Sequence, residues 1–140
     1  MTGMKSDDVA GSLKWADLTS EKKCVLYNAA TSSLLQDVLL DWEPESSASE
    51  LVSQIPRLAS AVVDLTSAGL VEVYLYRDFP NDDGDFILGD EMRSTVENTA
   101  AWNLESDREI LVELISTSWA EEVLRSRGSE DLYSYRNHSS

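Results

Sequence analysis

The feature that most constrains the fold is a change in the spacing of apolar residues at Gly69, within the stretch 47–88. Before this glycine, apolar residues recur every three or four positions, at Ile55, Leu58, Val62 and Leu65. This spacing predicts an amphipathic helix with one buried face. Over 70–76 the spacing becomes two, which predicts a strand. A glycine between the two patterns is typical of a helix C-terminus.

The region before the apolar helix carries a helix start of its own. Ser47 and Glu50 have the spacing of a capping box, in which the two residues satisfy each other's backbone amides. Pro56 has no amide hydrogen and disfavours the helical conformation of the residue before it. Proline does suit the first position of a new helix. We therefore expect a first helix that ends by Ile55 and a second helix over 56–68.

The residues after the strand predict a hairpin. The run 81–85, NDDGD, consists of turn-forming residues, and 86–88 can pair back with the strand. This order of helix, helix, strand, turn and strand resembles that of the winged-helix superfamily. The resemblance implies that 56–68 takes the place of the recognition helix and that 77–85 takes the place of the wing tip.

The remaining patterns predict further helices and one more strand. Over 19–42, the apolar residues after Ser33 lie nearly opposite those before it. This favours a break near Ser33. If one long helix survives instead, its second half, 34–42, needs a partner such as the other subunit of a homodimer. A helix from Gly89, a strand over 109–115 and a final helix over 118–126 complete the prediction. We expect a winged-helix-like α+β domain, with helices packed on a three-stranded antiparallel sheet.

The length of 140 residues predicts a single domain, 1–140, with flexible tails over 1–12 and 129–140. Cys24 is the only cysteine, and its apolar neighbours predict a buried core residue. No stretch approaches the ~20 apolar residues needed to span a membrane, and the N-terminus has no run typical of a signal peptide. We therefore expect a cytoplasmic protein with no membrane partner.

The net charge of −15, from 11 basic and 26 acidic residues, opposes binding to nucleic acid. In winged-helix proteins that read DNA, the second helix and the wing carry the contacts. The corresponding segments here contribute Arg57 and Arg77 as cations, and carboxylates outnumber them along the wing. We expect no direct DNA binding.

The sequence lacks the residues that metal binding and catalysis need. If Gly84 is placed at position six of a calcium loop of the EF-hand type, Phe79 falls at the first ligand position and cannot bind the ion. One cysteine and His138 cannot build a zinc site. No glycine-rich phosphate loop and no nucleophile–base set is visible. We expect no enzyme, no metal and no cofactor.

Aromatic residues beside a charged turn are typical of a protein interface. The predicted partner-binding residues are Tyr74, Tyr76, Phe79, Asp82, Asp83 and Asp85. The alternative for the tyrosines is that they pack beneath the last helix. We expect an acidic protein-interaction module that binds a basic protein surface. One alternative is a winged-helix transcription regulator that uses Arg57 and Arg77. The other is an acidic mimic of DNA that occupies a nucleic-acid-binding protein.

Overall fold

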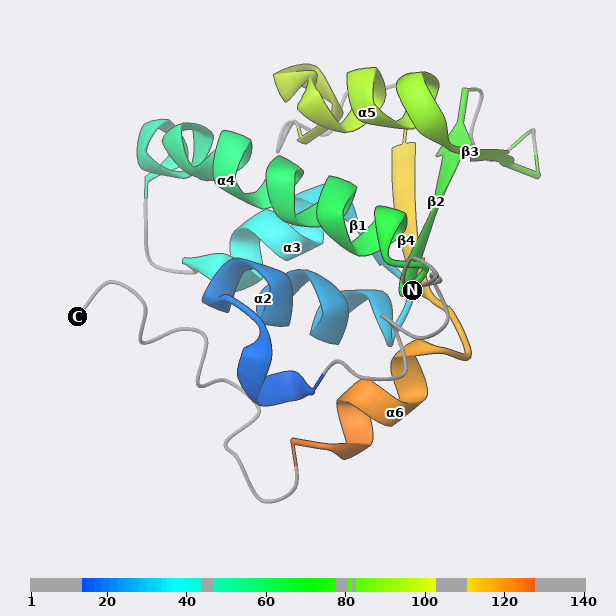
Figure 1. Cartoon of the computed structure of the whole chain (residues 1–140). Coiled ribbons are helices and arrows are strands. Elements are labelled where there is room, and N and C mark those ends of the chain that lie inside the picture. Colours follow the sequence, from blue (N-terminus) through cyan, green and yellow to red (C-terminus); the bar gives the residue numbers. More distant parts are fainter. Residues whose placement is uncertain (1–13, 44–46, 78–80, 82, 103–110, 128–140) are drawn as a thin grey trace.

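The structure is a computed structural model, and it describes residues 14–43, 47–77, 81, 83–102 and 111–127 (Figure 1). It is an α+β fold with helices packed on an antiparallel sheet, as the sequence predicts. In chain order the elements are η1 (Trp15–Asp17), α2 (Ser20–Ala29), β1 (Ser33–Leu34), α3 (Leu35–Trp42), α4 (Ala48–Ser67), β2 (Val71–Tyr76), β3 (Asp85–Ile87), α5 (Gly89–Glu97), η2 (Thr99–Trp102), β4 (Leu111–Ser116) and α6 (Ala120–Arg125).

The sheet has the strand order β1-β4-β2-β3, and each neighbouring pair is antiparallel. Strands β2, β3 and β4 lie close to the predicted bounds, and β4 is an inner strand between β1 and β2. The prediction of three strands is wrong, because Ser33 and Leu34 add β1 beside β4. A strand of two residues shows no alternation of apolar and polar positions, so the sequence carried no sign of it.

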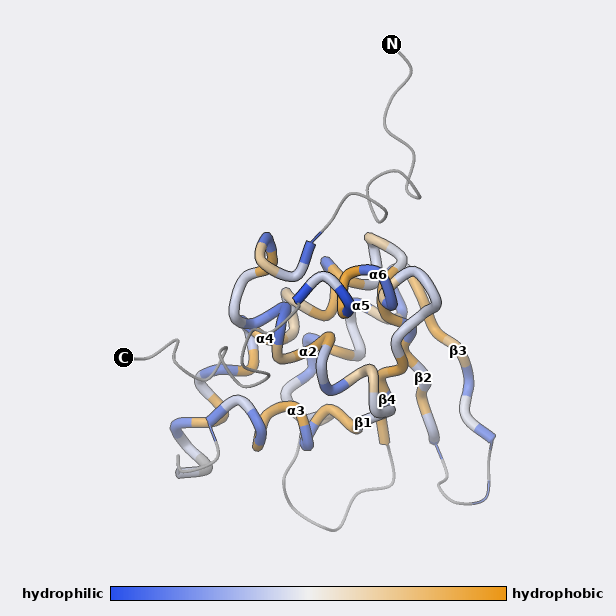
Figure 2. The backbone as a smooth tube through the Cα atoms, turned by 90° about the horizontal axis from the view of Figure 1, so that it is seen from below, coloured by the Kyte–Doolittle hydropathy of each residue, from blue (hydrophilic) through white to orange (hydrophobic). Residues whose placement is uncertain are grey.

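The helices lie on one side of the sheet, as the two views at right angles show (Figures 1 and 2). The strand side chains on that side are buried: Val71, Val73 and Leu75 of β2, Ile87 of β3, and Val112 and Leu114 of β4. They join the helices in one hydrophobic core, which also holds Trp15, Trp42, Trp102 and the thiol of Cys24, buried as predicted. No helix among the described residues is long and apolar enough to cross a membrane.

Helix α4 runs through Pro56 without interruption. The predicted pair of helices joined at Pro56, and with it a helix-turn-helix within 47–68, is therefore wrong. The apolar stripe keeps its helical spacing across the proline, and all of its members are buried: Leu51, Ile55, Leu58, Val62 and Leu65. Burial contributes about 2 kcal/mol for each such side chain, against a cost of ~3 kcal/mol for a proline inside a helix. Packing therefore outweighs the local preference of the proline, which lies exposed.

The start of α4 is the predicted capping box. Ser47 Oγ accepts a hydrogen bond from the amide of Glu50 at 3.3 Å, and Glu50 Oε1 accepts from the amide of Ser47 at 3.1 Å. The Ser47 hydroxyl also donates to Glu50 Oε1 at 2.7 Å. The hydroxyl and then the amide lower the pKa of Glu50, because both stabilise its charged form.

The predicted break in 19–42 is confirmed. Helix α2 ends at Ala29, and Ser32 adopts a left-handed conformation with φ of 59° before β1 and α3 follow. Four apolar side chains of α3 are buried, namely Leu35, Val38, Leu39 and Trp42, and the helix packs against α2, α4, η2 and β4 of the same chain. The core of this chain thus covers the face of 34–42 that had suggested a homodimer, so that argument for a homodimer no longer applies.

We expect Pro56→Ala to raise the free energy of unfolding by about 1–2 kcal/mol. The substitution restores an amide that can bond to the carbonyl of Val52 and removes the ring, a gain of up to ~3 kcal/mol. A more flexible unfolded chain offsets about 1 kcal/mol of this gain. Urea unfolding followed by circular dichroism measures the difference.

Ser60→Ala, at another exposed position of α4, is the matched control and changes only helix propensity, by roughly 0.5 kcal/mol. A loss of stability in Pro56→Ala would contradict the continuous helix. Proline at the first position of a separate helix is favourable, so its removal would then destabilise the protein.

Candidate interaction surface

The side of the sheet away from the helices carries rings, aliphatic side chains and two carboxylates. We call this set the outer face; its members alternate with the buried strand residues and are Glu72, Tyr74, Tyr76, Phe86, Leu111, Glu113 and Ile115. The strand register places Tyr74 between Glu113 and Phe86. The side chains are half-buried, except for Phe86, which is 50% exposed. The predicted alternative, with the tyrosines beneath the last helix, does not hold, because α6 packs against η1.

Both tyrosine hydroxyls on the outer face donate to carboxylates. Tyr74 donates to Glu72 at 3.2 Å, and Tyr76 donates to Glu113 of the neighbouring strand at 2.8 Å. The rings of Tyr74 and Phe86 lie 5.6 Å apart at an angle of 41°, a geometry favourable for aromatic pairs. The hydrogen bonds and the ring contact therefore hold the two carboxylates in place among apolar groups.

The environment of Tyr74 disfavours its ionised form. Partial burial is the main cause that raises the pKa of Tyr74, and the charge of Glu72 is the second. The hydrogen bond to Glu72 and the charge of Glu113 act in the same direction. Since this pKa is higher in the folded than in the unfolded chain, the neutral tyrosine contributes stability below pH ~10 that is lost as the pH rises through the folded pKa.

Gly84, in the acidic turn, lies against the ring of Tyr76 on the outer face. Gly84 has a φ of 82°, and a Cβ at this position would lie 2.7 Å from ring atoms of Tyr76. Only glycine fits a left-handed turn pressed against a ring so closely. Asp83 and Asp85 are exposed beside it. The structure thus brings four of the predicted partner-binding residues together, while Phe79 and Asp82 lie outside the described residues.

Among the described residues, no group of three or more metal-ligating side chains is close enough to hold an ion. Asp85 instead forms an ion pair with Arg77, which also donates to Glu91 at 2.8 Å. The arginine at the predicted wing is therefore flanked by two carboxylates.

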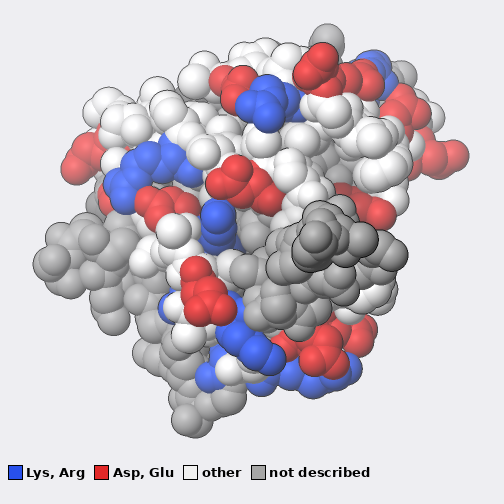
Figure 3. Space-filling model, viewed as in Figure 1, with Lys and Arg blue, Asp and Glu red and all other residues white. Residues whose placement is uncertain are grey.

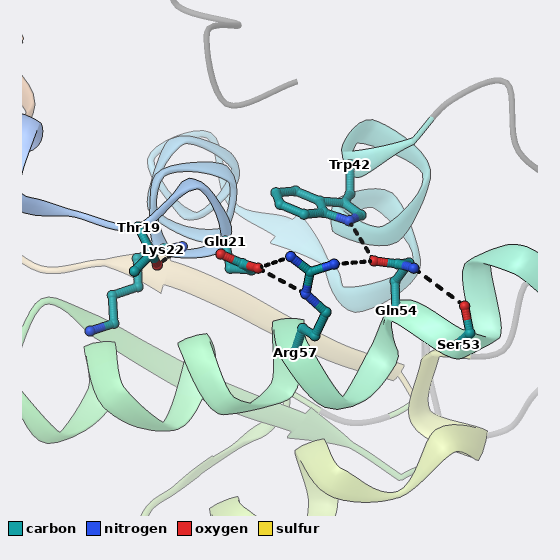
Figure 4. Close-up of polar contacts among 7 residues, drawn as sticks. All are labelled: Thr19, Glu21, Lys22, Trp42, Ser53, Gln54 and Arg57. Atoms are coloured by element: carbon teal, nitrogen blue, oxygen red, sulfur yellow. Dashed lines mark hydrogen bonds and ion pairs between the residues drawn. The ribbon is translucent and has the colours of Figure 1, made fainter. Parts of the chain in front are cut away.

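Arg57, the other predicted cation for DNA, lies in a polar network between α2 and α4 (Figure 4). Its Nε donates to Glu21 at 2.9 Å, and its Nη1 donates to Gln54 at 3.0 Å. The guanidinium also lies 5.7 Å from the centre of the Trp42 ring. The amide oxygen of Gln54 accepts from the Trp42 indole as well, at 3.3 Å. Arg57 is thus bound on several sides by its own chain.

Around α2 and α4, the described lysine and arginine side chains lie beside acidic ones (Figure 3). Beside the Arg57 network, Lys22 lies 3.6 Å from Asp64, and basic and acidic groups alternate across the view. A hollow of about 260 Å³ between α2 and α4 is lined by both signs of charge. Among the described residues, the surface around α2 and α4 therefore does not have the continuous positive charge that phosphate binding requires.

Sequence reasoning missed three exposed apolar side chains near the outer face. The sequence predicts Phe86 and Leu88 only as part of a return strand, and Trp119 only as part of the final helix. They are 50%, 64% and 50% exposed, respectively. Because successive side chains of a strand point to opposite faces, only one of Phe86 and Ile87 could face the core, and this was a signal for Phe86. Nothing in the sequence distinguished Trp119 from the three tryptophans that are buried.

Comparison with protein-family models, curated proteins and solved structures finds no match. The class of protein must therefore be argued from its fold and surface alone. These define an acidic α+β protein whose sheet is covered by helices on one side.

We expect Glu72→Gln to lower the pKa of Tyr74 towards its ordinary value. The substitution removes a negative charge that opposes formation of tyrosinate, and it leaves the strand intact. Tyrosine ring carbon shifts, followed by NMR against pH, measure the titration, and Tyr74→Phe identifies the resonance.

Glu97→Gln, on the exposed side of α5, should leave the titration unchanged. An unaltered Tyr74 titration in Glu72→Gln would show that the carboxylate does not act on the ring.

Proposed function

We propose that this protein is a non-enzymatic, acidic interaction module whose outer face binds a basic surface of a partner protein. The observation that carries the proposal is the composition of the outer face, where rings and aliphatic groups surround the carboxylates of Glu72 and Glu113. Aromatic groups provide most of the energy at protein interfaces, and complementary charge selects the partner.

We propose that the fold is winged-helix-like. It differs from the sequence prediction in which helices form the helix pair. Helices α3 and α4 precede β2, so the helix pair of such a fold would be α3 and α4, with the whole of α4 in the place of the recognition helix. In that arrangement Arg57 lies on the recognition helix and Arg77 at the base of the wing.

The ion pairs that each of these arginines forms with carboxylates argue against DNA as the ligand. Ion pairs at exposed sites are worth only about 0–1 kcal/mol, so a phosphate could displace the carboxylate from either arginine. The displaced carboxylates, Glu21 beside Arg57 and both Asp85 and Glu91 beside Arg77, would then face the phosphates. The repulsion would cancel much of the gain.

We expect no binding to mixed-sequence duplex DNA at low salt, where attraction to phosphate is strongest. Fluorescence anisotropy of labelled duplex, titrated with the protein, measures this. If the duplex binds and Arg57→Glu abolishes the binding, a winged-helix regulator is the better description. Arg125→Glu, on α6, is the control for a general effect of charge.

Selection from a phage-displayed library of random peptides tests the interaction itself. We expect the wild-type protein to enrich peptides that are rich in lysine and arginine. The double variant E72Q/E113Q should bind these peptides about tenfold more weakly, the equivalent of ~1.4 kcal/mol. The control D64N/E97Q removes the same charge from exposed sites on α4 and α5. Equal weakening in both variants would mean that net charge alone attracts the peptides, and would contradict a specific outer face.

A further inference from the structure

A hollow of about 640 Å³ lies at one end of the sheet, between the end of α4, the start of α5 and the turn before α6. The register of the strands explains its origin. The pairing of β2 with β3 ends at Val73 and Ile87, so Val71 and Glu72 of β2 extend past the last residue of β3. The chain then leaves the sheet through Leu88 into α5. The volume falls within the range of about 300–1,000 Å³ that is typical of ligand pockets.

The rim of this hollow is apolar and exposed. Phe86, Leu88 and Trp119 all line it, and each is at least half exposed. The other large apolar side chains that are exposed in the described part of the chain, Leu40 and Val52, belong to α3 and α4. Single exposed apolar residues are common on protein surfaces, whereas a cluster around a hollow marks a site of contact.

Two of the three rim residues directly precede a helix without capping it. Leu88 is the N-cap of α5 and Trp119 is the N-cap of α6, and neither side chain caps its helix. Serine, threonine, aspartate or asparagine at an N-cap would stabilise the helix. Helix capping does not account for a leucine and a tryptophan here, and at least half of each side chain is left exposed. Contact with a partner accounts for both.

The charges at the hollow indicate what kind of partner fits. Among the described residues that line the hollow, Glu72 is the one that carries a charge, and none is a lysine or an arginine. The hydroxyl of Tyr74 holds the carboxylate of Glu72. A cation on the partner would therefore meet a fixed carboxylate beside an apolar hollow, in a chain of net charge −15.

We propose that the hollow binds an apolar side chain of a basic partner segment, which packs between Phe86, Leu88 and Trp119 while an adjacent lysine or arginine pairs with Glu72. This inference rests on the proposed function and specifies which side chains hold the partner. Trp119 is the central contact, since buried aromatic anchors carry most of the energy of such interfaces.

The experiment uses synthetic copies of the peptides selected by the full-length wild-type protein. Trp15, Trp42 and Trp102 are at most 1% exposed, so quenching of fluorescence by acrylamide reports chiefly on Trp119. We expect the peptides to contain an apolar residue next to a lysine or arginine, and to protect Trp119 from acrylamide. Affinity should fall about thirtyfold in Leu88→Ser and in Trp119→Ser. Leu40→Ser, which removes an exposed leucine from α3, should bind like the wild type.

The serine variants also separate binding from folding. Leu88 has the extended backbone of an N-cap, where serine is favoured, so the melting temperature of Leu88→Ser should be unchanged or higher. Trp119 has a helical backbone, so the melting temperature of Trp119→Ser is measured beside its affinity as the check on its folding. Suppose that the affinity for basic peptides depends on Glu113 but is the same in both serine variants as in the wild type. This result would overturn the proposed contact at the hollow and leave the proposed function standing. Failure to select basic peptides would contradict both. Protection of Trp119 that rises with protein concentration, without peptide, would assign the hollow to a second copy of the chain.

Discussion

Burial of the apolar stripe of α4 is the constraint on which the rest of the structure depends. The stripe gives α4 contacts with α2, α3, α5 and β2, so one helix holds the helical layer together and attaches it to the sheet. The same burial keeps the helix continuous through Pro56. A shorter helix that began at the proline would not include Leu51 and would lose the capping box at Ser47, two features that the chain provides for a helix of this length.

With the helical layer on one side, the sheet is left with two unlike faces. The inner strand positions are aliphatic, whereas the outer positions combine rings with glutamates. A solvent-exposed sheet face is usually polar, and the outer face departs from that rule at Tyr74, Tyr76 and Phe86. Each tyrosine presents both apolar and polar groups on this face, since its ring covers the sheet while its hydroxyl bonds to a carboxylate. The outer face is therefore stable in water and still rich in apolar surface.

The sequence predicted the elements whose signal is local. The capping box at Ser47, the end of a helix before Gly69 and the alternation of 71–76 each depend on neighbouring residues, and the structure contains all three. Pro56 was misread because its local preference opposes a gain that only tertiary packing supplies. Strand β1 and the exposure of Trp119 depend on residues distant in the sequence, so no spacing rule reveals them. For the candidate surface, the tyrosines and the acidic turn were predicted to lie together, but the hollow required the register of β2 and β3.

The arrangement of charge makes the outer face more selective than the net charge alone. Arg57, Arg77 and Arg125 each bond to carboxylates of their own chain, which neutralises local charge around the helices and the acidic turn. The carboxylates of Glu72 and Glu113 bond instead to tyrosine hydroxyls, which orient them without cancelling their charge. Because these carboxylates are already fixed in position, little further conformational entropy is lost when a partner binds. An acidic chain thus concentrates oriented negative charge beside its exposed rings, where a basic partner gains from both.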